Sequence, residues 1–353
     1  MGSRSSFKAI NLAIVLGSLG LSLTGCSTLG YLIQAGHGQL KMINRARPIT
    51  EVLKDERVSP RIRTLLTQIP KIKKFGEDNS LKPTSNYIEY VQLDQAAASW
   101  IVSACEPLKF KSKEWNFPIV GRFPFLGWFD LDRAKAHAKE LREEGWEVDL
   151  RGAAAYSTLG WFRDPVVSSM IQEGDDALGG LVNVVLHESV HATFYISGQA
   201  FFDESIANYV ADGLTLDYLS KTYGAESKEL KSYVRAESDY ETRRKSIHEA
   251  YEKLNGVYSS GQTDESKKVV KEQILGDLNA KLKPKHPINN ATLIQFKTYH
   301  VGMDEFDELF RSCGRSWQRF WGAIKNVSEK SFKKSQQEDL GPIILPLVRA
   351  GCS

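Results

Sequence analysis

Two histidines and a glutamate lie within five consecutive residues of this chain, at a spacing that suits metal-assisted hydrolysis. His187, Glu188 and His191 form the pattern H-E-x-x-H, which follows the apolar run 181–186. The run predicts a helix, and about 3.6 residues per turn would place both histidines on one face. Two such imidazoles can bind one Zn²⁺, while Glu188 takes a proton from a metal-bound water. The alternative is a chance match, but the flanking helical pattern favours a metal site.

A catalytic zinc needs a third protein ligand, and the chain offers one downstream. Glu204 opens a second helical stretch, and Gly198 lies in the reversal between the two helices. We expect this helix–turn–helix to bring Glu204 over the histidines and complete a His, His, Glu site. Asp203 is the rival ligand, but we expect it to cap the new helix. Asp212 could orient a ligand, although solvation on the helix surface is the simpler interpretation.

The N-terminus has the features of an export signal. Arg4 and Lys8 precede a mostly apolar stretch, 10–23, which is short for a membrane span. The stretch ends in Leu23-Thr24-Gly25-Cys26, which resembles the lipobox of bacterial lipoproteins. The resemblance implies a signal peptide, 1–25, and acyl chains on Cys26 that anchor the protein to a membrane. Ser27 would then favour the outer membrane, facing the periplasm, in a Gram-negative cell; the alternatives are an ordinary signal peptide and an uncleaved anchor.

Composition limits the partners. The chain has 353 residues, 42% of them hydrophobic, and a net charge of +3. It is therefore large enough for one large or two moderate globular domains. No basic stripe with interleaved aromatic residues occurs, so we expect no nucleic-acid partner. Cys313 and Cys352 could pair in an oxidising compartment, with Cys105 left over, or all three could be free.

Periodicity predicts an α+β protein that is mostly helical, with a small mixed β-sheet before the H-E-x-x-H helix. The main predicted helices are 31–47, 131–144, 178–197 and 204–223, and the main predicted strands are 87–93, 98–105 and 146–150. A charged stretch within 223–285 predicts a long helical hairpin, broken near Asn255-Gly256 and 259–261. The hairpin could contact a protein partner, but we favour a solvated insertion. The predicted regions are a signal peptide (1–25), an N-terminal helical segment (26–80), the sheet with the metal site (81–222), the hairpin (223–285) and a C-terminal helical region (286–353).

Several blocks together resemble a family of bacterial envelope lipoproteins described as aminopeptidases of the gluzincin metallopeptidase type. The blocks are 31–35, 38–40, 47–49, 115–121, 155–162, 164–165, 187–191, 202–205 and 289–291. They follow one another over most of the chain after Cys26, so their combination is more specific than H-E-x-x-H alone. Asp203 stands where the family pattern has Asn, and Asn116 where a Cys is common. Neither departure removes a predicted ligand.

The resemblance implies a gluzincin-like fold, a Zn²⁺ cofactor and a peptide substrate. Gluzincins run an edge strand beside the bound peptide, so Tyr156 and Gly160 are candidate substrate-binding residues, unless 156–162 is a buried aromatic loop. Tyr156, Tyr299 and His300 are candidate oxyanion donors. An aminopeptidase also needs an acid for the substrate amine, and Glu173, Asp175 and Asp176 precede the metal helix. The alternatives are an envelope zinc endopeptidase and a non-catalytic zinc-binding scaffold, which would not need Glu188.

Overall fold

The computed structural model describes residues 25–117, 121–155, 163–298 and 301–352. Helices dominate this part of the chain and the strands form small sheets, so the predicted α+β class is confirmed. The helices are α1 (Gly25–Arg45), α2 (Ile49–Val52), α3 (Pro60–Leu66), α4 (Ile69–Asp78), α5 (Leu131–Glu143), α6 (Ala177–Thr193), α7 (Ala200–Tyr223), α8 (Lys228–Ser259), α9 (Asp264–Leu282), α10 (Asn290–Thr298), α11 (Met303–Ser312), α12 (Trp317–Ile324) and α13 (Gly341–Ala350). The strands are β1 (Arg47–Pro48), β2 (Glu89–Val91), β3 (Ser99–Cys105), β4 (Trp115–Phe117), β5 (Gly121–Phe123), β6 (Phe125–Trp128), β7 (Glu147–Ala153) and β8 (Val166–Val167).

The predicted small mixed sheet before α6 is present, but the described strands form two further sheets that the sequence did not predict. The order β1-β2-β8 is mixed, with β2 antiparallel to β1 and parallel to β8. The order β6-β3-β7 is fully antiparallel, and β4 pairs with β5 alone. Periodicity marks strands but not their partners, and these partners come from distant segments.

The antiparallel sheet has one packed face and one face toward α6. On the packed face, Val102, Ala104 and Val148 bury against Ala138 and Leu141 of α5. Asp130 caps α5 by accepting a hydrogen bond from the Arg133 N–H, so the helix begins where the sequence predicted. Successive side chains of a strand point to opposite faces, so the alternate residues of β3, β6 and β7 are left for the α6 side.

Helices α6 and α7 pack against each other at the centre of the main hydrophobic core. The prediction that Glu204 opens the second helix is wrong, because α7 already begins at Ala200. The Ala200 N–H donates to Oε1 of Gln336, at 3.0 Å. A distant side chain therefore satisfies the first turn of α7, which local sequence signals do not reveal.

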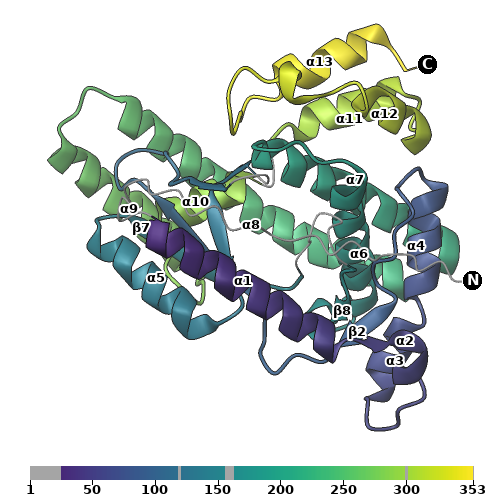
Figure 1. Ribbon diagram of the computed structural model, residues 1–353. Coiled ribbons are helices and arrows are strands. Elements are labelled where there is room, and N and C mark those ends of the chain that lie inside the picture. Colours follow the sequence, from purple (N-terminus) through teal and green to yellow (C-terminus); the bar gives the residue numbers. More distant parts are fainter. Residues whose placement is uncertain (1–24, 118–120, 156–162, 299–300, 353) are drawn as a thin grey trace, which may run out of the picture.

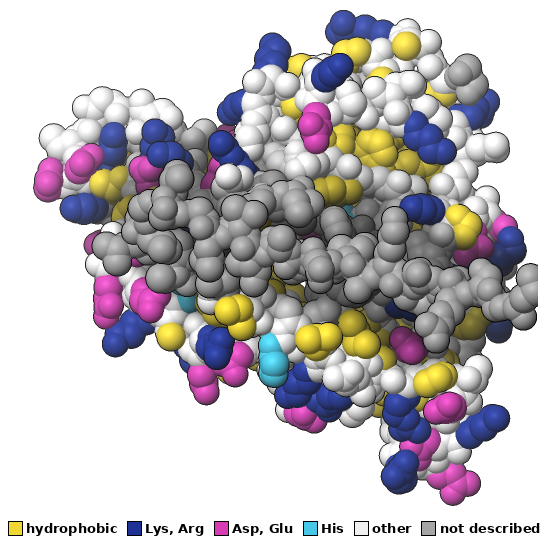
Figure 2. All heavy atoms as spheres, viewed as in Figure 1, with side chains coloured by type: hydrophobic (Ala, Val, Ile, Leu, Met, Phe, Trp, Pro, Cys, Tyr) yellow, Lys and Arg dark blue, Asp and Glu magenta, His cyan; other side chains and the backbone are white. Residues whose placement is uncertain are grey.

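The charged hairpin is confirmed as α8 and α9, which extend to one side of the molecule (Figure 1). The predicted break is confirmed at 259–261, where α8 ends at Ser259 and Thr263 caps α9 by accepting from the Ser266 N–H. It is wrong at Asn255-Gly256, which lies inside α8. Acidic and basic side chains are mixed over the end of the hairpin in the view of Figure 2.

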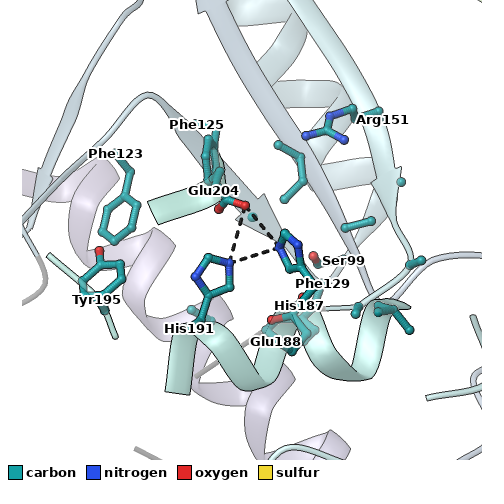
Figure 3. A pocket seen from close by; sticks show the side chains of 18 of the residues that line it. Ser99, Phe123, Phe125, Phe129, Arg151, His187, Glu188, His191, Tyr195 and Glu204 are labelled. Carbon is teal, nitrogen blue, oxygen red and sulfur yellow. Dashed lines mark hydrogen bonds and ion pairs between the residues drawn. The ribbon is translucent and has the colours of Figure 1, made fainter. Parts of the chain in front are cut away.

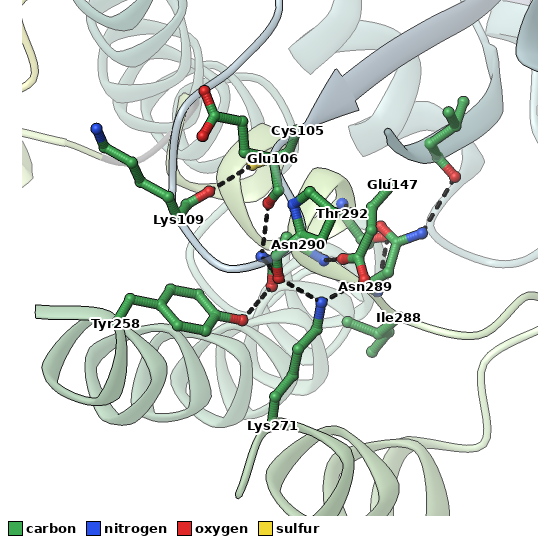
Figure 4. A network of polar contacts seen from close by, with 12 residues as sticks. Cys105, Glu106, Lys109, Glu147, Tyr258, Lys271, Ile288, Asn289, Asn290 and Thr292 are labelled. Carbon is green, nitrogen blue, oxygen red and sulfur yellow. Dashed lines mark hydrogen bonds and ion pairs between the residues drawn. The ribbon is translucent and has the colours of Figure 1, made fainter. Parts of the chain in front are cut away.

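A buried polar network joins the hairpin to the antiparallel sheet (Figure 4). Lys271 of α9 pairs with Glu147 of β7 and donates to the Pro107 carbonyl at 2.7 Å. The Asn290 N–H donates to the same Glu147 carboxylate, and the Asn290 side chain accepts from Tyr258 of α8. Asn290 therefore helps to join the hairpin to the antiparallel sheet.

Helix α1 crosses the sheet and covers the edge strand β6 (Figure 1). The Gln34 amide donates to the Gly127 carbonyl, and its oxygen accepts from the Phe129 N–H, both at 3.3 Å. Gly38 allows this close approach, because a Cβ there would lie 2.1 Å from the Phe129 ring. Within the described part of the chain, no helix is both long and apolar enough to cross a membrane.

The C-terminal helices close the other side of the core. Trp321, Phe320 and Phe306 are fully buried there against α7. Cys313 and Cys352 form a disulfide that links the end of α11 to the end of α13, so the pairing considered from the sequence is present. Cys105 is a free, buried cysteine.

Candidate metal centre

The predicted metal ligands meet in one cluster between α6 and α7. The Nε2 atoms of His187 and His191 lie 3.1 Å apart. Oε2 of Glu204 lies 3.4 Å from Nε2 of His187 and 3.5 Å from Nε2 of His191. Figure 3 shows the three side chains converging from the two helices.

This donor set fits a zinc ion. Zinc bonds of about 2.0–2.1 Å in a tetrahedron place neighbouring ligand atoms about 3.3 Å apart, close to the three separations found here. Two imidazole nitrogens and one carboxylate oxygen are also among the donors that zinc prefers. The three side chains are mostly buried, with exposed fractions of 7–16%. The cluster could therefore hold a metal without rearrangement of its ligand atoms.

The two glutamates of the centre differ in charge state. Burial raises the pKa of Glu188 to about 7, and nearby Glu204 and Asp164 add to this effect while His187 opposes it. Burial also tends to raise the pKa of Glu204, but the two imidazoles outweigh it and hold that pKa well below the usual range. Glu204 is thus an ionised carboxylate beside the two imidazoles, whereas Glu188 can both accept and release a proton near neutral pH.

Asp203 has a different task from the predicted helix cap. It lies in the first turn of α7 and is 1% exposed. Its Oδ1 accepts a hydrogen bond from the Ile196 N–H at 2.9 Å, which holds the reversal between α6 and α7. Burial raises the pKa of Asp203 well above its ordinary value, and the hydrogen bond from the Ile196 N–H partly opposes this.

Asp212 is not the solvated surface residue that the sequence favoured. Its Oδ1 accepts a hydrogen bond from the Asn183 amide at 2.8 Å and lies 3.5 Å from the Tyr233 hydroxyl. Burial raises its pKa, and the charge of His187 partly lowers it again. Asp212 therefore supports α6 through Asn183, near the charge of His187.

A cavity of about 730 Å³ opens over the cluster and Glu188. Its opposite wall is the free face of the antiparallel sheet, and Phe117, Phe123 and three residues of α1 extend it on one side. The described lining residues are Tyr31, Leu32, Ala35, Ser99, Ile101, Phe117, Phe123, Phe125, Gly127, Phe129, Arg151, Gly152, Ala153, Ala154, Ala155, Asn183, Val184, His187, Glu188, His191, Tyr195 and Glu204. In Figure 3, Phe123 and Tyr195 lie on the His191 side of the cluster and Arg151 on the His187 side.

The sequence alone missed this wall. Phe123, Phe125, Gly127 and Phe129 alternate along the chain, but their segment is not among the main strands that the sequence predicts. The alternation is the signal that could have grouped them on one face of a strand. Arg151 falls on the same face through its pairing with Ile101, which no local pattern shows.

Several other predicted site residues are not placed in this cavity. Tyr156, Gly160, Tyr299 and His300 lie outside the described residues, and the side chain of Cys26 is likewise not described. The three candidate amine-binding acids, Glu173, Asp175 and Asp176, are not among the described lining residues, and Asp175 pairs with Lys228 on the surface.

Comparison with known proteins gives one match. A family model with the description "putative aminopeptidase" matches residues 30–340 of the chain. No curated protein and no solved structure matches the chain significantly.

Proposed function

Because this chain belongs to the putative aminopeptidase family, we propose that it is a zinc-dependent peptidase of the gluzincin type that acts on peptides in the bacterial cell envelope. The observation that carries the proposal is the convergence of His187, His191 and Glu204 at ligand spacing, with Glu188 in the same cavity. A bound Zn²⁺ would supply Lewis acidity, lowering the pKa of a water and polarising the scissile carbonyl.

Glu188 is the proposed general base. Its carboxylate would take a proton from the attacking water and deliver it to the leaving amine. A pKa near 7 suits both directions of transfer, because neither protonation state is strongly favoured at neutral pH. A purely structural zinc site has no need of such a buried acid, which argues against the scaffold alternative.

Two further side chains of the cavity suit a peptide. Tyr195 keeps its proton, because burial raises the pKa of its phenol, and its O–H is a donor for a developing oxyanion. Arg151 places a positive charge on the His187 side, where it could bind a carbonyl or a carboxylate of the substrate. Since no acid other than Glu188 and Glu204 occurs among the described lining residues, cleavage from the amino end is proposed on the family membership alone.

Membrane attachment through acyl chains on Cys26 is also part of the proposal. Helix α1 begins beside this residue, and Leu32, Ile33, Leu40 and Ile43 are exposed along it. Figure 2 shows apolar side chains at the surface along the line of this helix. Such side chains would suit the interface of a bilayer to which the chain is anchored. Labelled palmitate should be incorporated by the wild type in a Gram-negative host but not by Cys26→Ala.

The experiment that tests the peptidase combines metal analysis with cleavage of a peptide library. The wild type should bind about one Zn²⁺ per chain and cleave peptides, and Glu188→Gln should keep the metal but lose about 10²–10⁴-fold in kcat. Glu237→Gln is the matched control: the same change on α8, outside the described cavity lining, should leave kcat unchanged.

The other outcomes separate the alternatives. Full turnover in Glu188→Gln would refute the assignment of the base. Zinc bound without cleavage by either protein would favour the scaffold. Equal cleavage of acetylated and free peptides would favour an endopeptidase over an aminopeptidase.

A further inference from the structure

A hollow in the sheet face lies within the cavity, at Gly127 of β6. Gly127 pairs with Ile101 of β3 and has Phe125 and Phe129 two residues to either side. All four residues line the cavity that also contains the metal cluster. Side chains two residues apart in a strand share a face, so the missing side chain of Gly127 leaves a gap between the two rings.

Among the described residues, no side chain occupies the position of a Cβ at Gly127, which lines the cavity. A Cβ added at Gly127 would come no closer than 3.7 Å to Ile101 and 3.9 Å to Ser99, which is ordinary contact. By contrast, a Cβ at the neighbouring Gly152 would lie 2.8 Å from the Cβ of Ala97, so packing explains that glycine.

Backbone conformation does not require Gly127 either. It is absent from the described residues with positive φ, and it lies inside a regular ladder between β6 and β3. Glycine weakens a strand interior, and one use that offsets this cost is close approach by a ligand.

The surroundings of the gap are apolar and aromatic. The rings of Phe123 and Phe125 have centroids 6.2 Å apart, those of Phe117 and Phe123 6.4 Å, and those of Tyr31 and Phe117 5.2 Å. These rings form a continuous row beside the gap, on a wall of a cavity whose surface is mostly apolar. A buried aromatic or branched aliphatic side chain gains from such contacts, whereas a charged one would lose its hydration.

We infer that the gap at Gly127 binds a large apolar side chain of the peptide substrate, so that the enzyme selects for residues such as Phe or Leu near the cleaved bond. This inference rests on the proposed function for the presence of a peptide, but the selectivity arises from the gap itself. A peptide whose Phe side chain is fully buried in the gap should bind about 30-fold more tightly than the same peptide with Ala, which corresponds to about 2 kcal/mol.

The test uses the peptides Ala-Ala-Xaa-Ala-Ala, with Xaa as Phe, Leu, Ala or Asp, free or acetylated at the amino end. Dissociation constants are measured with Glu188→Gln loaded with zinc, and kcat/KM with the wild type. In the binding assay, Phe should be preferred over Ala about 30-fold, and Asp should bind worst. Adding Gly127→Val should fill the gap. It should weaken binding of the Phe peptide about 10-fold or more and change binding of the Ala peptide by no more than about twofold.

Gly127→Ala fills less of the gap and should cause an intermediate loss of affinity for the Phe peptide. Gly322→Val is the control, because Gly322 is in α12 and is not among the described lining residues of the cavity. Equal binding of Phe and Ala, or a Phe:Ala ratio that Gly127→Val leaves unchanged in a folded protein, would overturn the inference. Selective binding of the Phe peptide without cleavage by the wild type would support the inference about the gap and refute the proposed peptidase activity. Cleavage without selectivity would support the peptidase activity and refute the inference about the gap.

Discussion

Replacing Lys271 with Met should loosen the attachment of the hairpin to the catalytic sheet. Lys271 is 7% exposed and its Nζ bonds the Glu147 carboxylate and the Pro107 carbonyl. Breaking a fully buried ion pair costs about 3–5 kcal/mol, because the partner charge is left without compensation. The Glu147 side chain is 24% exposed and keeps the hydrogen bond from the Asn290 N–H. Solvent and this bond reduce the expected loss to about 2–3 kcal/mol.

The assay is urea unfolding at pH 7, with excess zinc so that metal occupancy is constant. Lys268→Met, at an exposed position on the same helix, should change the free energy of unfolding by less than about 0.5 kcal/mol. In the double variant Lys271→Met/Glu147→Gln the unpaired charge of Glu147 is gone. Its free energy of unfolding should therefore be about 1 kcal/mol or more higher than that of Lys271→Met alone. A loss in Lys271→Met no larger than in Lys268→Met, or strictly additive effects in the double variant, would refute the argument.

Three further predictions concern the metal, pH and the disulfide. Zinc at about 100 times its Kd should stabilise the wild type by about 2.7 kcal/mol and raise its Tm. Glu204→Gln should lose most of this rise in Tm. A chelator that leaves the Tm of the zinc-loaded wild type unchanged would contradict the prediction. Burial, with the charge of Asp212, raises the pKa of Glu237 from 4.5 to about 7, so its ionisation weakens the fold as pH rises through that range. Glu237→Gln should therefore add about 1 kcal/mol at pH 8, after discounting for its partial exposure, and nothing below about pH 4.5; equal urea midpoints at pH 8 would rule this out. The disulfide between Cys313 and Cys352 closes a loop with a sequence separation of 39 residues. Replacing both cysteines with Ser should therefore lower the free energy of unfolding by about 4 kcal/mol through the entropy of the unfolded chain. Identical wild-type melts with and without reductant would contradict this prediction.

The sequence predicted that His187, His191 and Glu204 lie together because local geometry fixes their positions. One helical turn separates His187 from His191, and a short reversal brings Glu204 back to them, so periodicity and one glycine were enough. The start of α7 at Ala200 was not predictable in this way, since Gln336 satisfies its first turn from a segment more than a hundred residues away. The same reason explains the sheets: strand candidates were found, but pairing depends on long-range packing.

Strand β7 connects the block 289–291 to the cavity wall. One end of the strand, at Glu147, is fixed by Asn290 and Lys271. Towards the other end, Arg151 and Ala153 face the cavity and pair through β3 with the strand that contains the gap. Because regular backbone hydrogen bonds join β7 to β3, we expect the anchored Glu147 end to restrict movement of the cavity wall. Asn290 and Lys271 lie outside the described cavity lining but can influence its shape through Glu147, so Lys271→Met should disturb substrate selectivity more than metal binding.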